Sequence, residues 1–239
     1  PQTAPRHYPT ARRVEDMNAG RFEFEADGVP LVPVATKETD PADPRSLYAA
    51  SKLSQEQMCE IACASVDVDY VALRLQNVYG PGQSLRNPYT GILSIFANIL
   101  RQDGTIDIFE DGEESRDFVF VEDVARAFRA AVDLAPDAPR VLNVGMGYAT
   151  TVTEMVQMLE AKMCKPGSSA VSGRFRPGDI RHNYADITRM RQHLGFVPEV
   201  DLREGLSRTV DWALTQPAEE DRSTKATEEL KGFLKAKDA

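Results

Sequence analysis

Two side chains suited to proton transfer stand four positions apart in this sequence, Tyr48 and Lys52. On a helix, this spacing places the phenol and the ammonium group one turn apart on the same face. A free tyrosine titrates near pH ~10, but a fixed lysine cation favours the phenolate and lowers the tyrosine pKa. Such a pair could take a proton from a hydroxyl group while a hydride leaves the same carbon. The alternative is a surface pair without chemistry, since the spacing also occurs by chance.

A helix must carry this pair, and the sequence predicts one over residues 46–65. Ser46 is a suitable N-cap, and Pro41 and Pro44 disfavour helix immediately before them. Apolar residues then recur at near-helical spacing: Leu47, Ala50, Leu53, Met58, Ile61 and Ala62. A short β-prone run over residues 70–75 follows, as expected of a buried parallel strand.

The remaining chain alternates between strand-like and helical patterns. Strands are predicted over residues 106–109, 117–121 and 140–144, helices over 91–101, 122–134 and 153–163, and a turn cluster over 77–82. Strands that alternate with helices predict an α/β fold with a largely parallel sheet.

Composition limits the classes of function. The chain has 239 residues, 42% of them hydrophobic, and a formal net charge of −9. It shows no basic stripe for nucleic acid and no apolar run of the ~20 residues that span a membrane. We therefore expect a cytoplasmic protein. Its three cysteines are predicted to pack as buried thiols, and no metal site is expected.

Several motifs occur in one order along the chain. Residues 44–53 with Glu56 resemble the catalytic helix of extended short-chain dehydrogenases/reductases, the family of NAD-dependent nucleotide-sugar epimerases and dehydratases. Later stretches resemble further family motifs in the same register: residues 74–82, 111–112, 116–118, 143–145, 176–179 and 194–198. Residues 84–91 and 109–116 are most similar to the dTDP-L-rhamnose 4-epimerases of that family, as is the long insertion before Tyr48.

The resemblance covers residues 30 to 214 and implies a fold. It implies the C-terminal part of a Rossmann-like doubly wound parallel sheet with a smaller α/β substrate-binding domain. Residues 1–45 would be an insertion or loop region, and residues 46–145 the rest of the Rossmann-like domain interleaved with substrate-binding segments. Residues 146–217 would form the C-terminal sugar-nucleotide-binding domain, followed by a charged tail over residues 218–239.

The resemblance also implies roles for single residues. Tyr48 and Lys52 would be catalytic and would contact NAD. Residues implied to bind the nucleotide sugar are Asn77, Arg86, Asn87, Phe109, Arg116 and Arg176. Guanidinium groups suit a diphosphate, although Arg116 could instead pair with Asp117 or Asp123 at the surface. Asn77 could alternatively cap a turn, and Phe109 could be an ordinary core residue.

These roles imply NAD-dependent epimerisation of a nucleotide sugar at C4, most similar to the dTDP-sugar enzymes, by a homodimer that buries the outer face of the Tyr48 helix. A 4,6-dehydratase and a non-catalytic nucleotide-sugar-binding protein remain alternatives.

The glycine turn that holds the NAD pyrophosphate in this family does not occur before Tyr48. Gly145 and Gly147 follow a predicted strand, but Thr150 stands where the third glycine would be. We expect the turn and the catalytic Ser/Thr to lie upstream of Pro1. The printed chain alone is therefore not expected to bind NAD tightly.

Overall fold

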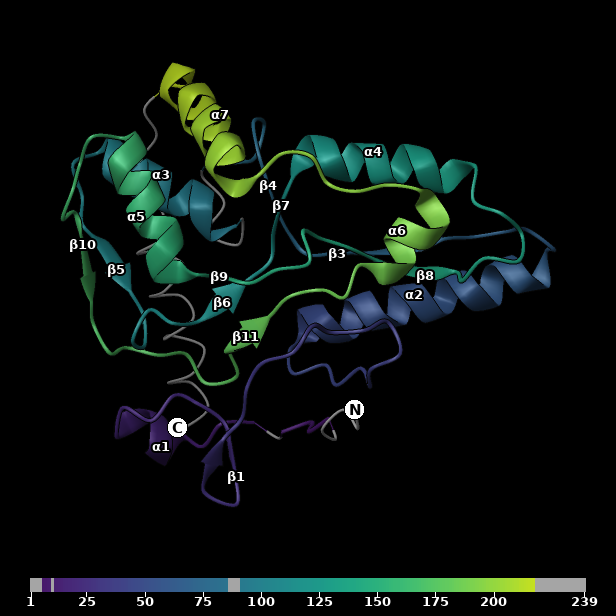
Figure 1. Ribbon diagram of the computed structural model, residues 1–239, viewed down its shortest axis with the longest axis horizontal. Helices are drawn as coiled ribbons and strands as arrows, with labels where there is room; N and C mark the ends of the chain where they lie inside the picture. The colour runs from purple at the N-terminus through teal and green to yellow at the C-terminus, as the bar shows by residue number, and fades with distance from the viewer. Residues whose placement is uncertain (1–5, 10, 86–90, 218–239) are drawn as a thin grey trace, which may run out of the picture.

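Parallel strand pairs joined by helices form the frame of the computed structural model, which describes residues 6–9, 11–85 and 91–217 (Figure 1). The parallel pairs are β3 (Ala72–Leu75) with β8 (Val141–Val144), β4 (Asn77–Tyr79) with β7 (Phe118–Phe120), β5 (Ile106–Ile108) with β10 (Ser169–Val171), and β6 (Ser115–Arg116) with β11 (His182–Asn183). A short antiparallel strand, β9 (Thr150–Thr151), pairs with β6. The predicted α/β class is confirmed.

Six helices cover these strands: α2 (Leu47–Ser65), α3 (Ile92–Arg101), α4 (Val121–Val132), α5 (Val152–Lys162), α6 (Thr188–Leu194) and α7 (Leu202–Thr215). Several begin where the sequence offers a cap. The Ser46 hydroxyl accepts the N–H of Ala49 at 3.1 Å and starts α2. Thr151 and Glu154 exchange hydrogen bonds as a capping box at the start of α5.

The core consists of two apolar clusters on opposite sides of β7. Phe118 and Phe120 belong to a cluster that also contains side chains of α3, β5, α5 and α7. Val119, between them, belongs to the second cluster, with side chains of α4, β8 and α6. Successive strand side chains point to opposite faces, so one three-residue strand supports both clusters.

The N-terminal segment has structure of its own. It contains α1 (Val14–Asn18) and a hairpin of β1 (Glu25–Ala26) and β2 (Val29–Pro30). Asp27 and Gly28 both have positive φ, as a tight hairpin turn requires. Met17 and Phe22 are buried. Further along, Thr36 forms a bridge with Ala185, so this segment lies against the C-terminal half.

Two expectations differ from the structure. Residues 77–79 form strand β4 rather than only a turn, because their backbone pairs with β7, more than 35 residues further along the chain. The cysteines are not buried: Cys59 and Cys164 are exposed and Cys63 is partly so. Cys59 and Cys63 lie on α2, which buries no side chain fully, and Cys164 lies in the turn just after α5. The predicted tail over residues 218–239 lies outside the described residues.

Among the helices that the structure describes, none is long and apolar enough to cross a membrane.

Candidate functional site

The Tyr48 and Lys52 side chains lie together on the first turns of α2. The Lys52 Nζ atom is 5.5 Å from the centroid of the Tyr48 ring. Tyr48 is 72% exposed, and Lys52 donates to the side chain of Gln55 at 3.2 Å. An ammonium group has three donors, so Lys52 can also bind a ligand on this open face.

The connection from α2 to the next strand, β3, shows at which end of the sheet Tyr48 and Lys52 lie. A helix that leads into a parallel strand runs back along the sheet, so its first turn lies near the carboxyl ends of the strands. Asn77 begins β4 at that end, just after β3, and its backbone N–H donates to the carbonyl of Asp117 at 2.9 Å. Ligands of open α/β sheets bind at this edge.

A partly buried salt bridge attaches α2 to β3. Arg74 donates through Nε and Nη2 to the two carboxylate oxygens of Glu56, at 2.9 and 2.7 Å. Its third donor, Nη1, reaches the carbonyl of Glu38 at 3.0 Å. Glu56 is one turn after Lys52 on the same helix, so this bidentate pair sets where the Tyr48 and Lys52 turns lie.

Phe109 lies directly after β5 and is covered by two guanidinium groups. Arg174 and Arg176 each approach the centre of its ring at 4.9 Å. Phe109 is only partly buried and belongs to neither core cluster. Its ring and Arg176, both predicted to bind the nucleotide, are thus neighbours.

Arg116 is partly buried at the end of β6 and makes neither ion pair considered in the sequence analysis. Its Nη1 atom donates to the carbonyls of Ser115 and Arg181, at 2.8 and 3.1 Å. Asp117 instead accepts three backbone N–H groups, and Asp123 accepts those of Glu199 and Val200. Burial lowers the pKa of the Arg116 guanidinium, because a charge in that position is poorly solvated.

Sequence reasoning missed a partly buried ionic cluster next to Arg116, composed of Arg12, Glu23, Glu110, Asp111 and Arg181. Arg181 is 1% exposed and bonds to all three carboxylates. Arg12 bonds to Glu110 at 2.7 Å. Nothing in local periodicity marks these residues, because the partners are 70 to 158 positions apart.

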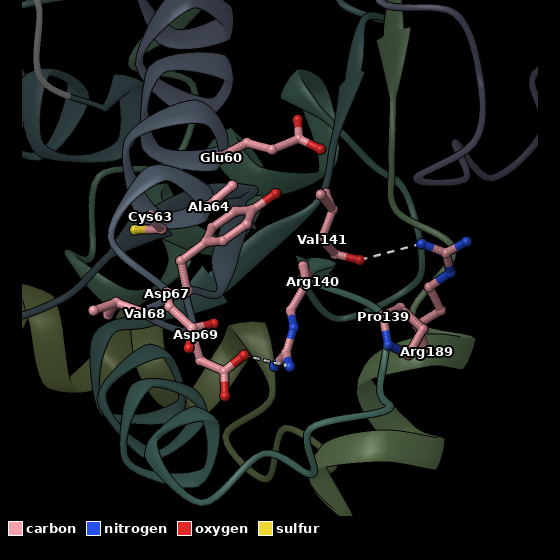
Figure 2. Close-up of a pocket in the computed structure, with 11 residues that line it drawn as sticks. Glu60, Cys63, Ala64, Asp67, Val68, Asp69, Pro139, Arg140, Val141 and Arg189 are labelled. Carbon is pink, nitrogen blue, oxygen red and sulfur yellow. Dashed lines mark hydrogen bonds and ion pairs between the residues drawn. The ribbon is translucent and has the colours of Figure 1, made fainter.

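The structure also contains an open pocket of about 830 Å³ at the other end of α2 (Figure 2). Glu60, Cys63 and Ala64 line it from α2, and Arg140 and Val141 from the start of β8. Its two arginines are engaged, Arg140 with Asp69 and Arg189 with the carbonyl of Val141. Glu60 is twelve residues after Tyr48, or about 18 Å along a helix. This pocket is therefore separate from the Tyr48 face.

Of the residues expected to bind substrate, Arg86 and Asn87 lie outside the described part of the chain. Apart from Asn77 at the start of β4, the others fall into two groups: Tyr48 and Lys52 on α2, and Phe109, Arg116 and Arg176 near β5 and β6. Within the described ranges, no hydrogen bond or ion pair joins the two groups. Gln76 and Asn183 link the strands between them with a 2.8 Å hydrogen bond.

Known proteins are similar to this chain in sequence. Residues 26–145 match the NAD dependent epimerase/dehydratase family. The chain is 36% identical over 205 residues to a dTDP-L-rhamnose 4-epimerase of Burkholderia thailandensis, covering 86% of this chain and 55% of that protein. It is 36% identical over 180 residues to a UDP-glucose 4-epimerase of Mycolicibacterium smegmatis, covering 74% and 56%.

A solved structure has the same arrangement of elements. The UDP-glucose 4-epimerase of Thermotoga maritima, solved with UDP-glucose, superposes with a TM-score of 0.70 at 34% identity, over 77% of this chain and 59% of that one. The chain thus spans little more than half the length of the relatives it matches.

Proposed function

The chain belongs to the NAD-dependent epimerase/dehydratase family, and we propose that the full-length protein epimerises a nucleotide sugar at C4 with NAD. One observation carries the proposal: Lys52 Nζ lies 5.5 Å from the Tyr48 ring centroid on an open helix face at the ligand-binding edge of the strands. That face leaves room for a nicotinamide and a sugar, and Lys52 has donors for a ribose hydroxyl.

In this mechanism, Tyr48 acts as the base. Its phenolate takes the proton of the C4 hydroxyl while the hydride on C4 leaves, which gives a 4-keto sugar. NAD, when bound, accepts that hydride and returns it. The 4-keto sugar rotates in the site, so that the hydride returns to the opposite face of C4. Tyr48 then gives the proton back to the oxygen on C4. The Lys52 ammonium group places a positive charge beside the Tyr48 ring on the same helix face.

The second group of residues would hold the nucleotide. Phe109 would stack against the pyrimidine base, and Arg116 and Arg176 would bind the diphosphate, which guanidinium groups match in geometry. Asn77, at the start of β4, would bind a sugar or diphosphate oxygen. Arg86 and Asn87 would cover the sugar nucleotide.

We infer a dTDP-sugar as the substrate, since the dTDP-L-rhamnose 4-epimerase of B. thailandensis matches the larger share of this chain, 86% against 74% for the UDP-glucose 4-epimerase of M. smegmatis. Full-length protein assayed with dTDP- and UDP-sugars tests this. An epimer keeps the mass of its substrate, whereas a dehydratase product has lost one water, so mass spectrometry separates the two reactions.

Replacing the base tests the mechanism. Tyr48→Phe should lower turnover by about 10²–10⁴-fold, the usual contribution of a general base, while substrate affinity changes little. Tyr184→Phe is the matched control, because its exposed hydroxyl makes only a 3.4 Å contact with the carbonyl of Pro33. Near-normal turnover in Tyr48→Phe would mean that another group takes the proton.

A further inference from the structure

The ionic cluster contains more carboxylates than arginines. Glu23, Glu110 and Asp111 face Arg12 and Arg181, and Arg116 is the next cation. The side chains of Arg12 and Glu110 are 5% and 2% exposed. A buried carboxylate without a partner is costly, so the arginines that bond to Glu110 stabilise its charge.

Each of these three carboxylates accepts at least one hydrogen bond from the two arginines of the cluster. Arg181 donates to Asp111 at 2.6 and 2.8 Å, to Glu110 at 3.0 Å and to Glu23 at 2.8 Å. Arg12 donates to the same Glu110 oxygen at 2.7 Å and to the carbonyl of Asp179 at 3.0 Å.

Arg116 pairs with no carboxylate among the described residues. Its Nη1 atom is held by the carbonyls of Ser115 and Arg181. Its Nε and Nη2 atoms make no hydrogen bond within the part of the chain that the structure describes. Glu114, Asp179 and Glu110 still act on its charge from a distance, so the absence of an ion pair is not due to a lack of nearby carboxylates.

We propose that Arg12 and Arg181 are positioning residues that engage the cluster's carboxylates and so keep the Arg116 guanidinium available for the diphosphate of a nucleotide sugar. This inference rests on the proposed function, and it gives the N-terminal segment a part in substrate binding. Arg12 reaches the cluster from the turn before α1. Glu110, which it binds, has a φ of 51°, a left-handed conformation that is costly for glutamate, and the ion pairs hold it there.

Removing Arg12 from the full-length protein tests the proposal. In Arg12→Met, Glu110 keeps only its bond from Arg181 and can pair with Arg116 as well. Affinity for dTDP, or for UDP if the wild type prefers it, should therefore fall about fivefold, the scale of one hydrogen bond. Affinity for the unphosphorylated nucleoside, followed by ligand-observed NMR, should stay within about twofold. Arg12→Lys and the double variant Arg12→Met/Glu110→Gln should bind the diphosphate as the wild type does.

A merely structural role predicts something else. Equal losses for nucleoside and nucleoside diphosphate in Arg12→Met, or no loss for the diphosphate, would overturn the proposal. If Arg12→Met does not fold, Glu110→Gln decides alone: it removes the competing charge, so diphosphate affinity should be kept or increased, and a loss would overturn the proposal. Arg129→Met, which removes an exposed arginine of α4, is the control.

The proposed site has its own test. If Arg116→Ala leaves diphosphate affinity unchanged, the nucleotide site itself is wrong and this inference is overturned with it. If Arg116→Ala weakens binding while Arg12→Met does not, the site is right and only the role of Arg12 is overturned.

Discussion

The surroundings of Arg116 in the structure decide between two roles that its sequence motif leaves open. Its motif with Asp117 and Phe118 suggests a ligand-binding arginine, but an arginine beside an aspartate could equally form a surface ion pair. The structure excludes that pair, because Asp117 accepts the N–H groups of Met146, Gly147 and Ala185 at 2.7 to 3.2 Å. Burial raises the pKa of Asp117, which these N–H groups partly offset by favouring its carboxylate.

We expect Arg116→Ala to weaken nucleoside diphosphate binding by roughly 1.5–3 kcal/mol, the value of a hydrogen bond to a charged group. Calorimetric titration of the full-length protein with dTDP and UDP measures this. Arg129→Ala serves as the control, because Arg129 is 75% exposed and pairs only with Asp133. Equal affinity in both variants would return Arg116 to a purely structural role.

At the scale of elements, α2 shows where sequence patterns succeed and where they mislead. Its start at Leu47 follows from the Ser46 cap, and its length from a run without proline or glycine. The apolar residues that recur at helical spacing do not form a buried stripe: Leu47, Met58 and Ile61 are 92%, 61% and 70% exposed. Within the described residues, the polar pair of Arg74 and Glu56 attaches this helix to β3.

Arg74→Met should therefore lower kcat by on the order of 10- to 100-fold, the cost of a small misplacement of catalytic groups. The KM for the nucleotide sugar should change little, because Phe109 and Arg116 do not contact this pair. Arg74→Lys should recover part of the rate. Arg140→Met, which removes a partner of the exposed Asp69 at the other end of β3, should behave as the wild type. An unchanged kcat in Arg74→Met would show that other contacts position α2.

The short elements could not be predicted. β6, β9 and β11 have two residues each, too few for an alternating pattern to stand out. They exist because distant segments pair: β9 and β11 flank β6 after separations of 35 and 67 residues. The same reason hides the ionic cluster, whereas Tyr48 and Lys52 were visible because their geometry is local to one helix.

At the scale of the whole molecule, the exposed side of α2 offers a surface for assembly. We propose that the full-length protein is a homodimer that buries the side chains of Met58 and Ile61, with Gln57 and Ser65 beside them. Ile61→Asp should raise the dimer dissociation constant by roughly tenfold or more, because a charge would have to be buried. Val132→Asp, on the exposed side of α4, is the control. Light scattering that finds the wild type monomeric at high micromolar concentration would contradict the dimer.

The ionic cluster also joins parts of the chain that local forces would leave apart. Glu23 comes from the N-terminal segment, Asp111 from the turn before β6, and Arg181 from the stretch that enters β11. In Figure 1 the N-terminal segment lies apart from the helices that enclose the first core cluster. Few apolar side chains anchor it, Met17 and Phe22 being the buried ones, so these charges contribute to its attachment.

That attachment should depend on pH in a definite direction. Burial disfavours the charges of Glu23 and Asp111 and is the largest single influence on each. The hydrogen bonds and charge of Arg181, together with His182 at Glu23 and the N–H of Glu113 at Asp111, outweigh it and hold the pKa of both carboxyls below their ordinary values. A carboxyl whose pKa is lowered by folding adds stability above its unfolded pKa, near ~4. That stability is lost as the pH falls through the lower folded value.

We therefore expect Asp111→Asn to be less stable than the wild type at neutral pH by on the order of 1 kcal/mol, a modest value because the carboxylate is partly exposed and screened. The difference should shrink as the pH falls below about 4, since the wild type then protonates the same group and loses the same interaction. Urea unfolding of both proteins at several pH values between neutral and acid measures this. Asp133→Asn, at a position whose side chain is 76% exposed, should track the wild type throughout. If the stability difference between Asp111→Asn and the wild type stays constant down to the lowest pH, Asp111 stabilises the fold by its shape and hydrogen bonds. Its charge would then not be what holds the segments together.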